Sequence, residues 1–209
     1  MSSHSVEANL RTSFMEAVKR RRTCYGLGKE QIVEQARIVD IVKDAVKYAP
    51  SAFNSQSARA VVLFGQDSDR LWSLTARTLQ KIVPADRFAE TQQRIDGFAA
   101  GYGTVLFFED QAVVRKLQDQ FPTFADQFPV WSNQSAGMLQ YIVWTALELE
   151  GLGASLQHYN PLIDDEVARE WQLPADWKLI AQMPFGKPTF QPGEKEFMPL
   201  EGRVKVFSA

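Results

Sequence analysis

The stretch Ala49-Pro50-Ser51-Ala52-Phe53-Asn54-Ser55-Gln56 joins a helical pattern to an apolar run and so sets the character of the fold. Residues 30–48 before it carry apolar side chains at spacings of three and four, which predicts a helix with one buried face. Pro50 ends that helix, because the residue before a proline avoids helical backbone. Residues 59–64, Arg-Ala-Val-Val-Leu-Phe, are predicted to form a short strand covered on both faces.

The same stretch has side chains that suit the binding of a flat heterocycle. Asn and Gln each offer a donor and an acceptor in one plane, which matches the pyrimidine edge of a flavin or a nucleobase. Proline, serine and asparagine are also ordinary turn residues, which connect a helix to a strand without any ligand. Both interpretations of Ser51, Asn54 and Gln56 stay open from these residues alone.

Helical and strand-like segments alternate along the rest of the chain. Residues 67–100 are mostly helical in pattern, and a long helix from near Ser132 is stopped by Gly151, where glycine favours a left-handed cap. Buried strands are predicted at 104–108 and before Pro184 at 179–183, and a half-exposed last strand at 203–207. With no repeat or long linker, residues 1–209 are expected to form one α+β domain with helices packed on a sheet.

The composition excludes several classes of protein. A chain of 209 residues with 45% apolar residues buries a full core, and its formal net charge of -2 lacks the positive field of a nucleic-acid binder. One cysteine, Cys24, and two histidines leave no internal disulfide and no expected metal site. No stretch reaches the roughly 18 apolar residues that span a bilayer. We therefore expect a soluble, cytoplasmic protein that binds neither nucleic acid nor membrane.

A basic segment, Lys19-Arg20-Arg21-Arg22-Thr23, follows a helical pattern near the N-terminus. Its charges either complement the C-terminal end of that helix dipole or form a phosphate clamp, in which guanidinium groups and the Thr23 hydroxyl bind phosphate oxygens. Cys24 beside it is either an inert packed thiol or a redox-sensitive one. Residues 157–161, Gln-His-Tyr-Asn-Pro, either shelter a ring or cap the helix that follows.

The chain lacks the local signatures of side-chain catalysis. It has no nucleophile elbow, Walker loop or recognisable carboxylate pair, and Gly151 and Gly153 follow a helix, which excludes a dinucleotide fingerprint. An enzyme whose chemistry belongs to a bound cofactor needs none of these. The segments at 21–23, 49–56 and 151–153, with Met-Pro-Phe-Gly-Lys-Pro at 183–188, together resemble the FMN-dependent nitroreductase family.

Two further segments refine this resemblance. Residues 100–110, Ala-Gly-Tyr-Gly-Thr-Val-Leu-Phe-Phe-Glu-Asp, and residues 157–161 are similar to the branch named after the yeast fatty-acid-repression-mutant protein. The resemblance implies a nitroreductase-like α+β fold with a mixed central sheet and helices on both faces. It also implies an intertwined homodimer with extended C-terminal segments and two FMN sites at the subunit interface.

The resemblance also assigns roles to particular residues. Arg21 and Thr23, with Arg20 or Arg22 and with Arg203, would hold the FMN phosphate. The partner's turn would supply Ser51, Ala52, Phe53, Asn54 and Gln56 to the isoalloxazine and ribityl groups, while the backbone of His158 and Tyr159 would lie near flavin N5. Tyr25 and Glu201 stand where a basic residue is common, and no lysine occurs between Gln92 and Gly103, so the phosphate contacts are expected to be rearranged.

The implied activity is an NAD(P)H-dependent flavin nitroreductase. NADH or NADPH would reduce FMN at N5, and the flavin would then reduce a small aromatic acceptor, nitroaromatic or quinone-like, in a ping-pong cycle with no catalytic side chain. The alternative is a flavin-binding regulatory or redox-sensing protein with incidental turnover, linked to a lipid or stress response.

Overall fold

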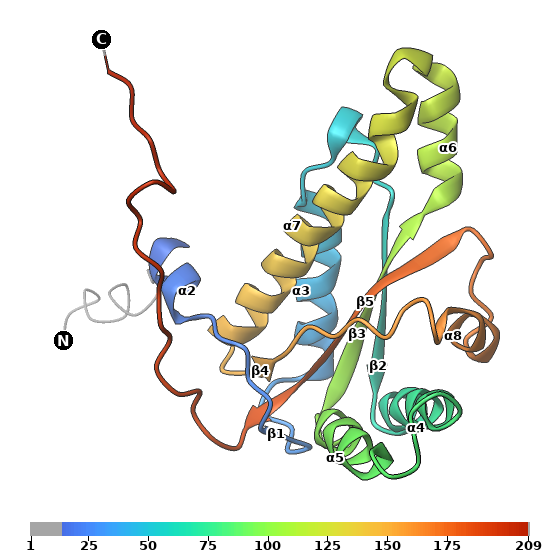
Figure 1. The fold of residues 1–209 in the computed structure, drawn as a ribbon, viewed down its shortest axis with the longest axis vertical. Helices are drawn as coiled ribbons and strands as arrows, with labels where there is room; N and C mark the ends of the chain where they lie inside the picture. The colour runs from blue at the N-terminus through green and yellow to red at the C-terminus, as the bar shows by residue number, and fades with distance from the viewer. Residues whose placement is uncertain (1–13, 209) are drawn as a thin grey trace.

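A computed structural model describes residues 14–208, and its centre is a five-stranded sheet (Figure 1). The strands follow the order β1-β5-β3-β2, and β4 pairs with β5 beside this path. Their bounds are β1 Leu27–Gly28, β2 Ala58–Phe64, β3 Gly103–Asp110, β4 Gly153–Ala154 and β5 Trp177–Pro188. The ladders between these strands are antiparallel, and an isolated parallel bridge between Thr23 and Ala154 makes the arrangement mixed.

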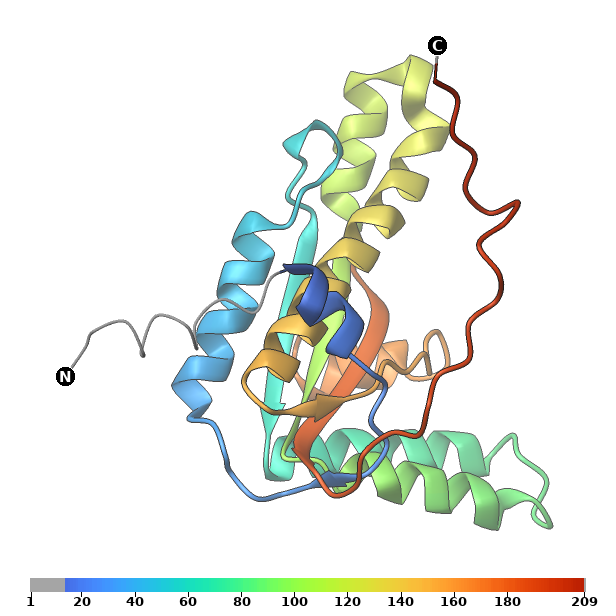
Figure 2. The same cartoon turned by 90° about the vertical axis from the view of Figure 1, so that its left-hand side faces the viewer.

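Helices cover both faces of the sheet, as the α+β prediction required (Figures 1 and 2). Successive side chains of a strand point to opposite faces, so β3 contributes side chains to two hydrophobic cores, one on each face of the sheet. Val105 and Phe107 pack under α3 (Gln35–Tyr48) and α7 (Phe128–Leu149). Leu106 and Phe108 pack on the other side, with α4, α5 and α8, which span Gln66–Gln80, Phe88–Ala99 and Asp164–Glu170.

The helix ends follow from local sequence. Ala49, just before Pro50, has extended backbone and ends α3, as predicted. Gly151 has a φ of +85°, the left-handed conformation expected after α7. Asp110 begins α6 (Gln111–Gln120), where its carboxylate accepts a hydrogen bond from the backbone N–H of Ala112 at 3.0 Å. The remaining helical segments are α2 Phe14–Arg20 and the 3₁₀ turns η1 Ala52–Asn54 and η2 Pro122–Gln127.

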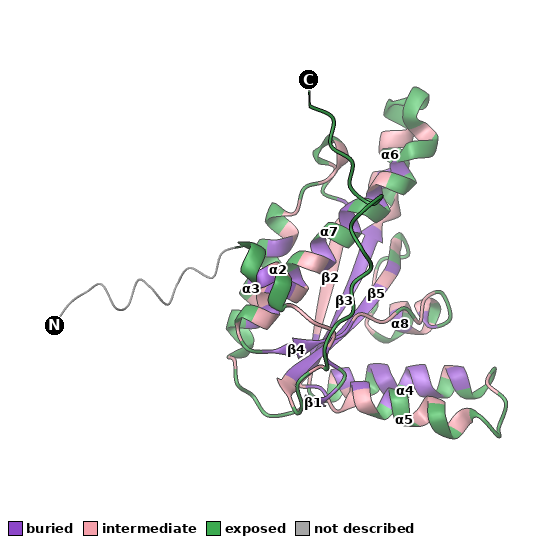
Figure 3. Cartoon of the chain, turned by 60° about the vertical axis from the view of Figure 1, so that its left-hand side comes forward, coloured by how far each residue is buried: buried purple, intermediate pink, exposed green. Residues whose placement is uncertain are grey.

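Three strand predictions need correction. β2 lies at the edge of the sheet, so most of it is only half-buried and Leu63 alone is buried, rather than covered on both faces. β5 does not stop at Pro184 but continues to Pro188, because Pro184 pairs with Thr104 of β3. Residues 203–207 are exposed and join no ladder in the described chain, apart from a bridge between Glu201 and Val204 (Figure 3).

Two properties of residues 14–208 concern membranes and metal ions. No helix in this range combines the length and the apolar character that crossing a membrane requires. The same residues contain no group of three or more His, Cys, Asp or Glu side chains placed to hold a metal ion.

Candidate functional site

The polar turn before β2 has an unusual backbone. Phe53, Asn54 and Gln56 adopt φ values of +56°, +50° and +51°, a left-handed conformation that glycine normally occupies. The Ser51 Oγ accepts a hydrogen bond from the Gln56 N–H at 3.0 Å and closes the turn. Each such residue costs about 1–3 kcal/mol, and strain of this kind concentrates at binding and active sites. The turn is therefore a candidate ligand-binding element.

An aromatic cluster holds the turn in this conformation. The Phe53 ring lies 4.9 Å from Phe121 and 5.3 Å from Phe128, measured between ring centroids. It also stacks on Trp131 of α7 at 6.0 Å, with the two ring planes 21° apart. Contacts between aromatic rings contribute about 0.5–1.5 kcal/mol each, enough to offset the strain at Phe53.

A hollow of about 450 Å³ lies between this turn and α7, and we call it the turn hollow. Its walls are mainly apolar, with few polar groups, as is typical of small-molecule sites. The lining residues are Pro50, Ser51, Ala52 and Phe53 from the turn, and Trp131, Gln134, Ser135 and Met138 from α7. The structure thus groups three predicted residues, Ser51, Ala52 and Phe53, with an α7 wall that sequence reasoning missed.

The other two predicted residues of the turn point elsewhere. Gln56 lines a separate groove of about 520 Å³ between α3 and β2. Asn54 is exposed, and its carbonyl oxygen accepts a hydrogen bond from the Gln56 Nε2 at 3.5 Å. Within a single chain, the turn therefore does not present Ser51, Asn54 and Gln56 to one cavity.

A second hollow, of about 560 Å³, lies beside α5, and we call it the α5 hollow. Its lining residues are Tyr25, Gln93, Arg94, Gly97, Phe98 and Gln157. Arg94 is exposed and forms no ion pair with any residue in the range 14–208. No lysine occurs between Gln92 and Gly103, as noted above, but Arg94 lies within that range and places a positive charge at this hollow.

The loop of His158 and Tyr159 borders the α5 hollow through Gln157. The Tyr159 N–H donates to the Gln182 Oε1 at 2.8 Å, and the Gln157 N–H donates to the Gln182 carbonyl oxygen at 2.7 Å. The Tyr159 ring packs on Trp72, and burial raises the pKa of its hydroxyl. His158 is exposed, and no acceptor among residues 14–208 receives its backbone N–H, so that group is available to a ligand.

The arginines of the basic segment make different contacts. Arg20 forms an ion pair with Glu148 at 3.3 Å, and Arg22 donates to the Gly193 carbonyl oxygen at 2.8 Å. Both line a cleft of about 380 Å³. Arg21 does not line this cleft, and its guanidinium carbon lies 4.3 Å from the centroid of the Trp144 ring of α7.

Arg21 is the residue of this segment with unmet hydrogen-bonding capacity. Its Nε and Nη1 are buried and have no hydrogen-bond partner among the described residues. Buried donors of this kind are rare in native proteins, and a charged donor is especially costly to leave unpaired. Thr23 lies beside it and bridges to Ala154. An anion bound at Arg21 and Thr23 would resolve this deficit.

Cys24 is packed rather than reactive. Its Sγ is buried and donates to the Gly26 carbonyl oxygen at 3.3 Å. Burial raises the pKa of the thiol, which disfavours the nucleophilic thiolate. These contacts support the inert interpretation of Cys24.

A single chain keeps the turn hollow and the basic segment apart. The turn contacts α7 at Trp131, whereas Arg21 contacts the same helix at Trp144. Thirteen residues at a helical rise of 1.5 Å correspond to about 20 Å along the helix. Arg203 lies in the exposed C-terminal segment, where its guanidinium donates to the Met198 carbonyl oxygen at 3.4 Å, and it has no contact with Arg21.

Comparisons with known proteins place this arrangement in a family. Residues 18–187 match the model of the Nitroreductase family. The nitroreductase FRM2 of Saccharomyces cerevisiae is 37% identical over 191 residues, which cover 89% of this chain and 93% of FRM2. The nitroreductase CinD of Lactococcus lactis has a TM-score of 0.86 and 46% identity, covering 94% of this chain and all of CinD.

A more distant structure shares the fold alone. A nitroreductase-fold protein from Desulfovibrio desulfuricans is 19% identical, with a TM-score of 0.68, and the match covers 95% of this chain and 99% of that protein. The family match spans most of the chain, and the yeast relative carries the branch assignment. The chain therefore belongs to the nitroreductase family, in the branch that includes yeast FRM2.

Proposed function

We propose that this protein is an FMN-dependent oxidoreductase that uses NADH or NADPH to reduce a nitroaromatic or quinone-like acceptor. Membership of the nitroreductase family supports an oxidoreductase. CinD was solved with chloramphenicol and with 4-nitrophenol, which are both nitroaromatic molecules. The Desulfovibrio desulfuricans protein was solved in complex with FMN. Bound FMN would supply the hydride chemistry, since its N5 can accept hydride from a nicotinamide and return it to an acceptor.

The observation that carries this proposal is the composition of the α5 hollow. It is lined by a cation without an ion pair among residues 14–208, Arg94, and by Gln157, whose neighbour in the chain, His158, has a backbone N–H without an acceptor in the same range. A flavin ring offers hydrogen-bond acceptors along its pyrimidine edge and at N5, so both groups fit it. Arg94 would also stabilise negative charge at that edge. The Tyr159 N–H, by contrast, is already bonded to Gln182, which leaves His158 as the closer match.

The phosphate contacts would come from the basic segment. Arg21 has two buried donor atoms without partners, and the Thr23 hydroxyl lies on the same stretch of chain. Arg20 and Arg22 are engaged by Glu148 and Gly193, so they would act mainly through their charge. A charge-assisted bond to a phosphate oxygen is stronger than a neutral one, which fits Arg21 as the principal contact.

We infer a homodimer, in which the turn hollow of one subunit completes the α5 hollow of the other. The separation of about 20 Å along α7 leaves each chain with two parts of a site that it cannot join by itself. The C-terminal segment is also rich in exposed apolar side chains: Phe197, Met198, Leu200, Val204, Val206 and Phe207. Phe207 is 92% exposed. Such a segment needs a partner surface, and docking on a second subunit would carry Arg203 toward a phosphate there.

The turn hollow would receive the acceptor in this arrangement. Its apolar walls, including Phe53 and Trp131, suit a flat ring, and Gln134 and Ser51 offer hydrogen bonds to a nitro or carbonyl oxygen. NADH or NADPH would occupy the same space in a separate half-reaction, which gives ping-pong kinetics. A cytoplasmic location agrees with the use of a nicotinamide reductant and with an unpaired thiol.

The decisive test is the visible spectrum of the purified protein under anaerobic conditions. A yellow protein that bleaches on addition of NADPH or NADH, and recovers its colour with a nitroaromatic acceptor, is the expected result. A yellow protein that neither nucleotide reduces would favour the flavin-binding regulatory protein over the enzyme. A protein that cannot be reconstituted with FMN would contradict the assignment of Arg21, Arg94 and His158 to a flavin site.

A further inference from the structure

Glu109 is a buried carboxyl group that the proposed chemistry does not use. It is the last residue but one of β3 and is 1% exposed. Its Oε2 accepts hydrogen bonds from the Ser57 Oγ at 2.5 Å and from the Ser132 Oγ at 2.6 Å. Its Oε1 is also buried and has no partner among the described residues. One oxygen atom therefore joins two separate segments of the chain.

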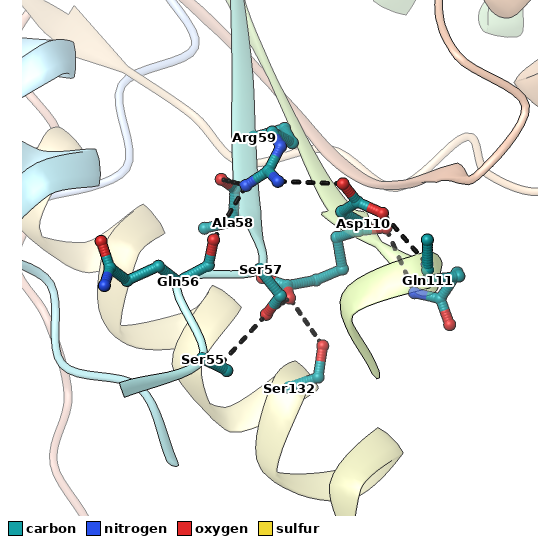
Figure 4. Close-up of polar contacts among 10 residues, drawn as sticks. Ser55, Gln56, Ser57, Ala58, Arg59, Asp110, Gln111 and Ser132 are labelled. Atoms are coloured by element: carbon teal, nitrogen blue, oxygen red, sulfur yellow. Dashed lines mark hydrogen bonds and ion pairs between the residues drawn. The ribbon is translucent and has the colours of Figure 1, made fainter. Parts of the chain in front are cut away.

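Those two segments form the opposite walls of the turn hollow. Ser57 follows directly after the strained turn, and its Oγ lies 3.5 Å from the Ser55 Oγ (Figure 4). Ser132 lies on α7 next to Trp131, which stacks on Phe53 across the hollow. Loss of the two hydrogen bonds at the Glu109 Oε2 would thus remove this link between the turn and α7.

A nearby ion pair supports the same corner. Arg59 of β2 donates to the Asp110 carboxylate at 2.9 Å and to the Gln56 carbonyl oxygen at 2.8 Å (Figure 4). Arg59 and Asp110 are the charged groups that act on Glu109, while the turn and α7 present serine hydroxyls to it. Arg59 thus holds the end of the turn through Gln56 and Asp110, whereas the side-chain hydrogen bonds of Glu109 come from Ser57 and Ser132.

Glu109 can keep its hydrogen bonds to both serines whether its carboxyl group is protonated or ionised. Burial raises the pKa of its carboxyl, while the two hydroxyl groups and Arg59 act in the opposite direction. A proton on Oε1, the oxygen without a partner, leaves both hydrogen bonds at Oε2 in place. The bridge between turn and helix therefore holds in either protonation state.

We propose that Glu109 is a positioning residue for the acceptor site, which fixes the distance between the strained turn and α7 by binding Ser57 and Ser132 on one oxygen. The inference rests on the proposed function, because it assumes that the turn hollow receives the acceptor. It predicts that loss of the bridge weakens acceptor binding more than it affects the flavin. A role in folding alone predicts a loss of stability with normal acceptor binding in the molecules that remain folded.

The experiment measures reoxidation of the chemically reduced FMN holoenzyme by stopped flow, which removes NADH and NADPH from the test. The acceptors are nitrofurazone, which must enter the hollow, and dioxygen, which is small enough not to depend on its width. Glu109→Met replaces the carboxyl group with a side chain of similar size that has no oxygen to accept the serine hydrogen bonds. Glu109→Gln retains one accepting oxygen. Ser68→Ala is the matched control, because it loses a buried hydroxyl contact with Thr104 at the opposite end of β3.

Glu109→Met is expected to raise the nitrofurazone concentration for half-saturation at least tenfold, with FMN content unchanged and the dioxygen rate within twofold. Glu109→Gln and Ser68→Ala should stay within 1.5-fold of the wild-type protein for both acceptors. Ser132→Ala, which removes one donor, should raise the half-saturation concentration about threefold and replaces Glu109→Met where that variant does not fold.

Wild-type half-saturation by nitrofurazone in Glu109→Met or Ser132→Ala would overturn the inference and leave the proposed function intact. Equal losses of FMN, dioxygen rate and nitrofurazone rate would overturn it as well, since they indicate a general structural role. A wild-type enzyme that dioxygen reoxidises and neither nitroaromatic nor quinone acceptors reoxidise would instead overturn the proposed function, and the inference with it.

Discussion

Glycine at position 53 should stabilise the protein more than alanine, which reverses the usual order of these two residues. Phe53 has a φ of +56°, a left-handed conformation. It costs a residue with a β-carbon about 1–2 kcal/mol and costs glycine almost nothing. Alanine has fewer unfolded conformations than glycine, which stabilises the folded state of the alanine variant by about 0.4–1 kcal/mol relative to the glycine variant. The balance favours Phe53→Gly over Phe53→Ala by roughly 1 kcal/mol.

Both substitutions also remove the aromatic contacts of Phe53. Its ring meets Phe121, Phe128 and Trp131, and each aromatic pair contributes about 0.5–1.5 kcal/mol. The side chain is 52% exposed, so the lower end of that range applies and the common loss is about 1.5 kcal/mol. This loss is the same in both variants and cancels when they are compared.

Urea unfolding of the FMN-free protein, followed by tryptophan fluorescence at one fixed protein concentration, measures the difference. The concentration is fixed because association would add its own stabilisation. With a slope near 3 kcal/mol per molar urea, the glycine variant should unfold about 0.3 M later than the alanine variant. Lys116, exposed within α6, is the control, and there alanine should exceed glycine by about 1 kcal/mol. An alanine variant at least as stable as the glycine variant at position 53 would refute the strained turn.

Three further predictions test the fold, the buried carboxyl and the flavin site. Gly186→Ala should cost about 3 kcal/mol or more in urea unfolding, because its β-carbon would lie 2.5 Å from the Gly28 carbonyl oxygen; an unchanged midpoint contradicts this. Burial raises the pKa of Glu109 above its ordinary value of 4.5, so its contribution is complete below that value and is lost as pH rises through the folded pKa. The stability of the wild-type protein relative to Glu109→Gln should therefore fall from pH 4.5 upward, and parallel curves would exclude the raised pKa. Arg94→Gln should lower the two-electron midpoint potential of bound FMN by about 30 mV, equivalent to about 1.4 kcal/mol, and an equal potential would remove Arg94 from the flavin site.

The parts of the fold that local pattern decides were predicted from the sequence. The helices at 35–48 and 128–149 follow from apolar spacing and from their stop signals at Pro50 and Gly151. The strand at 103–110 follows from a continuous apolar run, since β2 and β5 flank it and helices cover both faces. In each case the information lies within a few residues.

Strand neighbours and the last segment needed information that the local pattern lacks. Residues 58–64 have the apolar composition of a central strand, yet β2 has β3 on one side alone, and no residue in the run encodes that position. Residues 203–207 alternate like a strand, but alternation supplies no neighbouring strand, and within the described chain their backbone hydrogen bonds are local, such as that from the Arg203 N–H to the Leu200 carbonyl oxygen. Which strands become neighbours is decided by the arrangement of the whole chain rather than by any one segment.

The candidate site was predicted by residue type more than by geometry. The turn at 49–56 was identified from its amides and hydroxyls, whereas the left-handed backbone and the contacts with Phe121 and Trp131 join residues about 70 positions apart. Arg94 was missed because the family pattern directed attention to lysine. Glu109 offered no signal, because a lone acidic residue at a strand end is ordinary until its two serine partners are known.

The length of α7 between Trp131 and Trp144 has a consequence for how this protein can change. Its two ends are about 20 Å apart within one chain, but the proposed homodimer brings the turn end of one subunit to the flavin of the other. Substitutions at the two ends would then act on one shared site, and their effects on acceptor preference and FMN retention are not expected to combine additively. Selection, in nature or in the laboratory, therefore has to adjust the two properties together rather than one at a time.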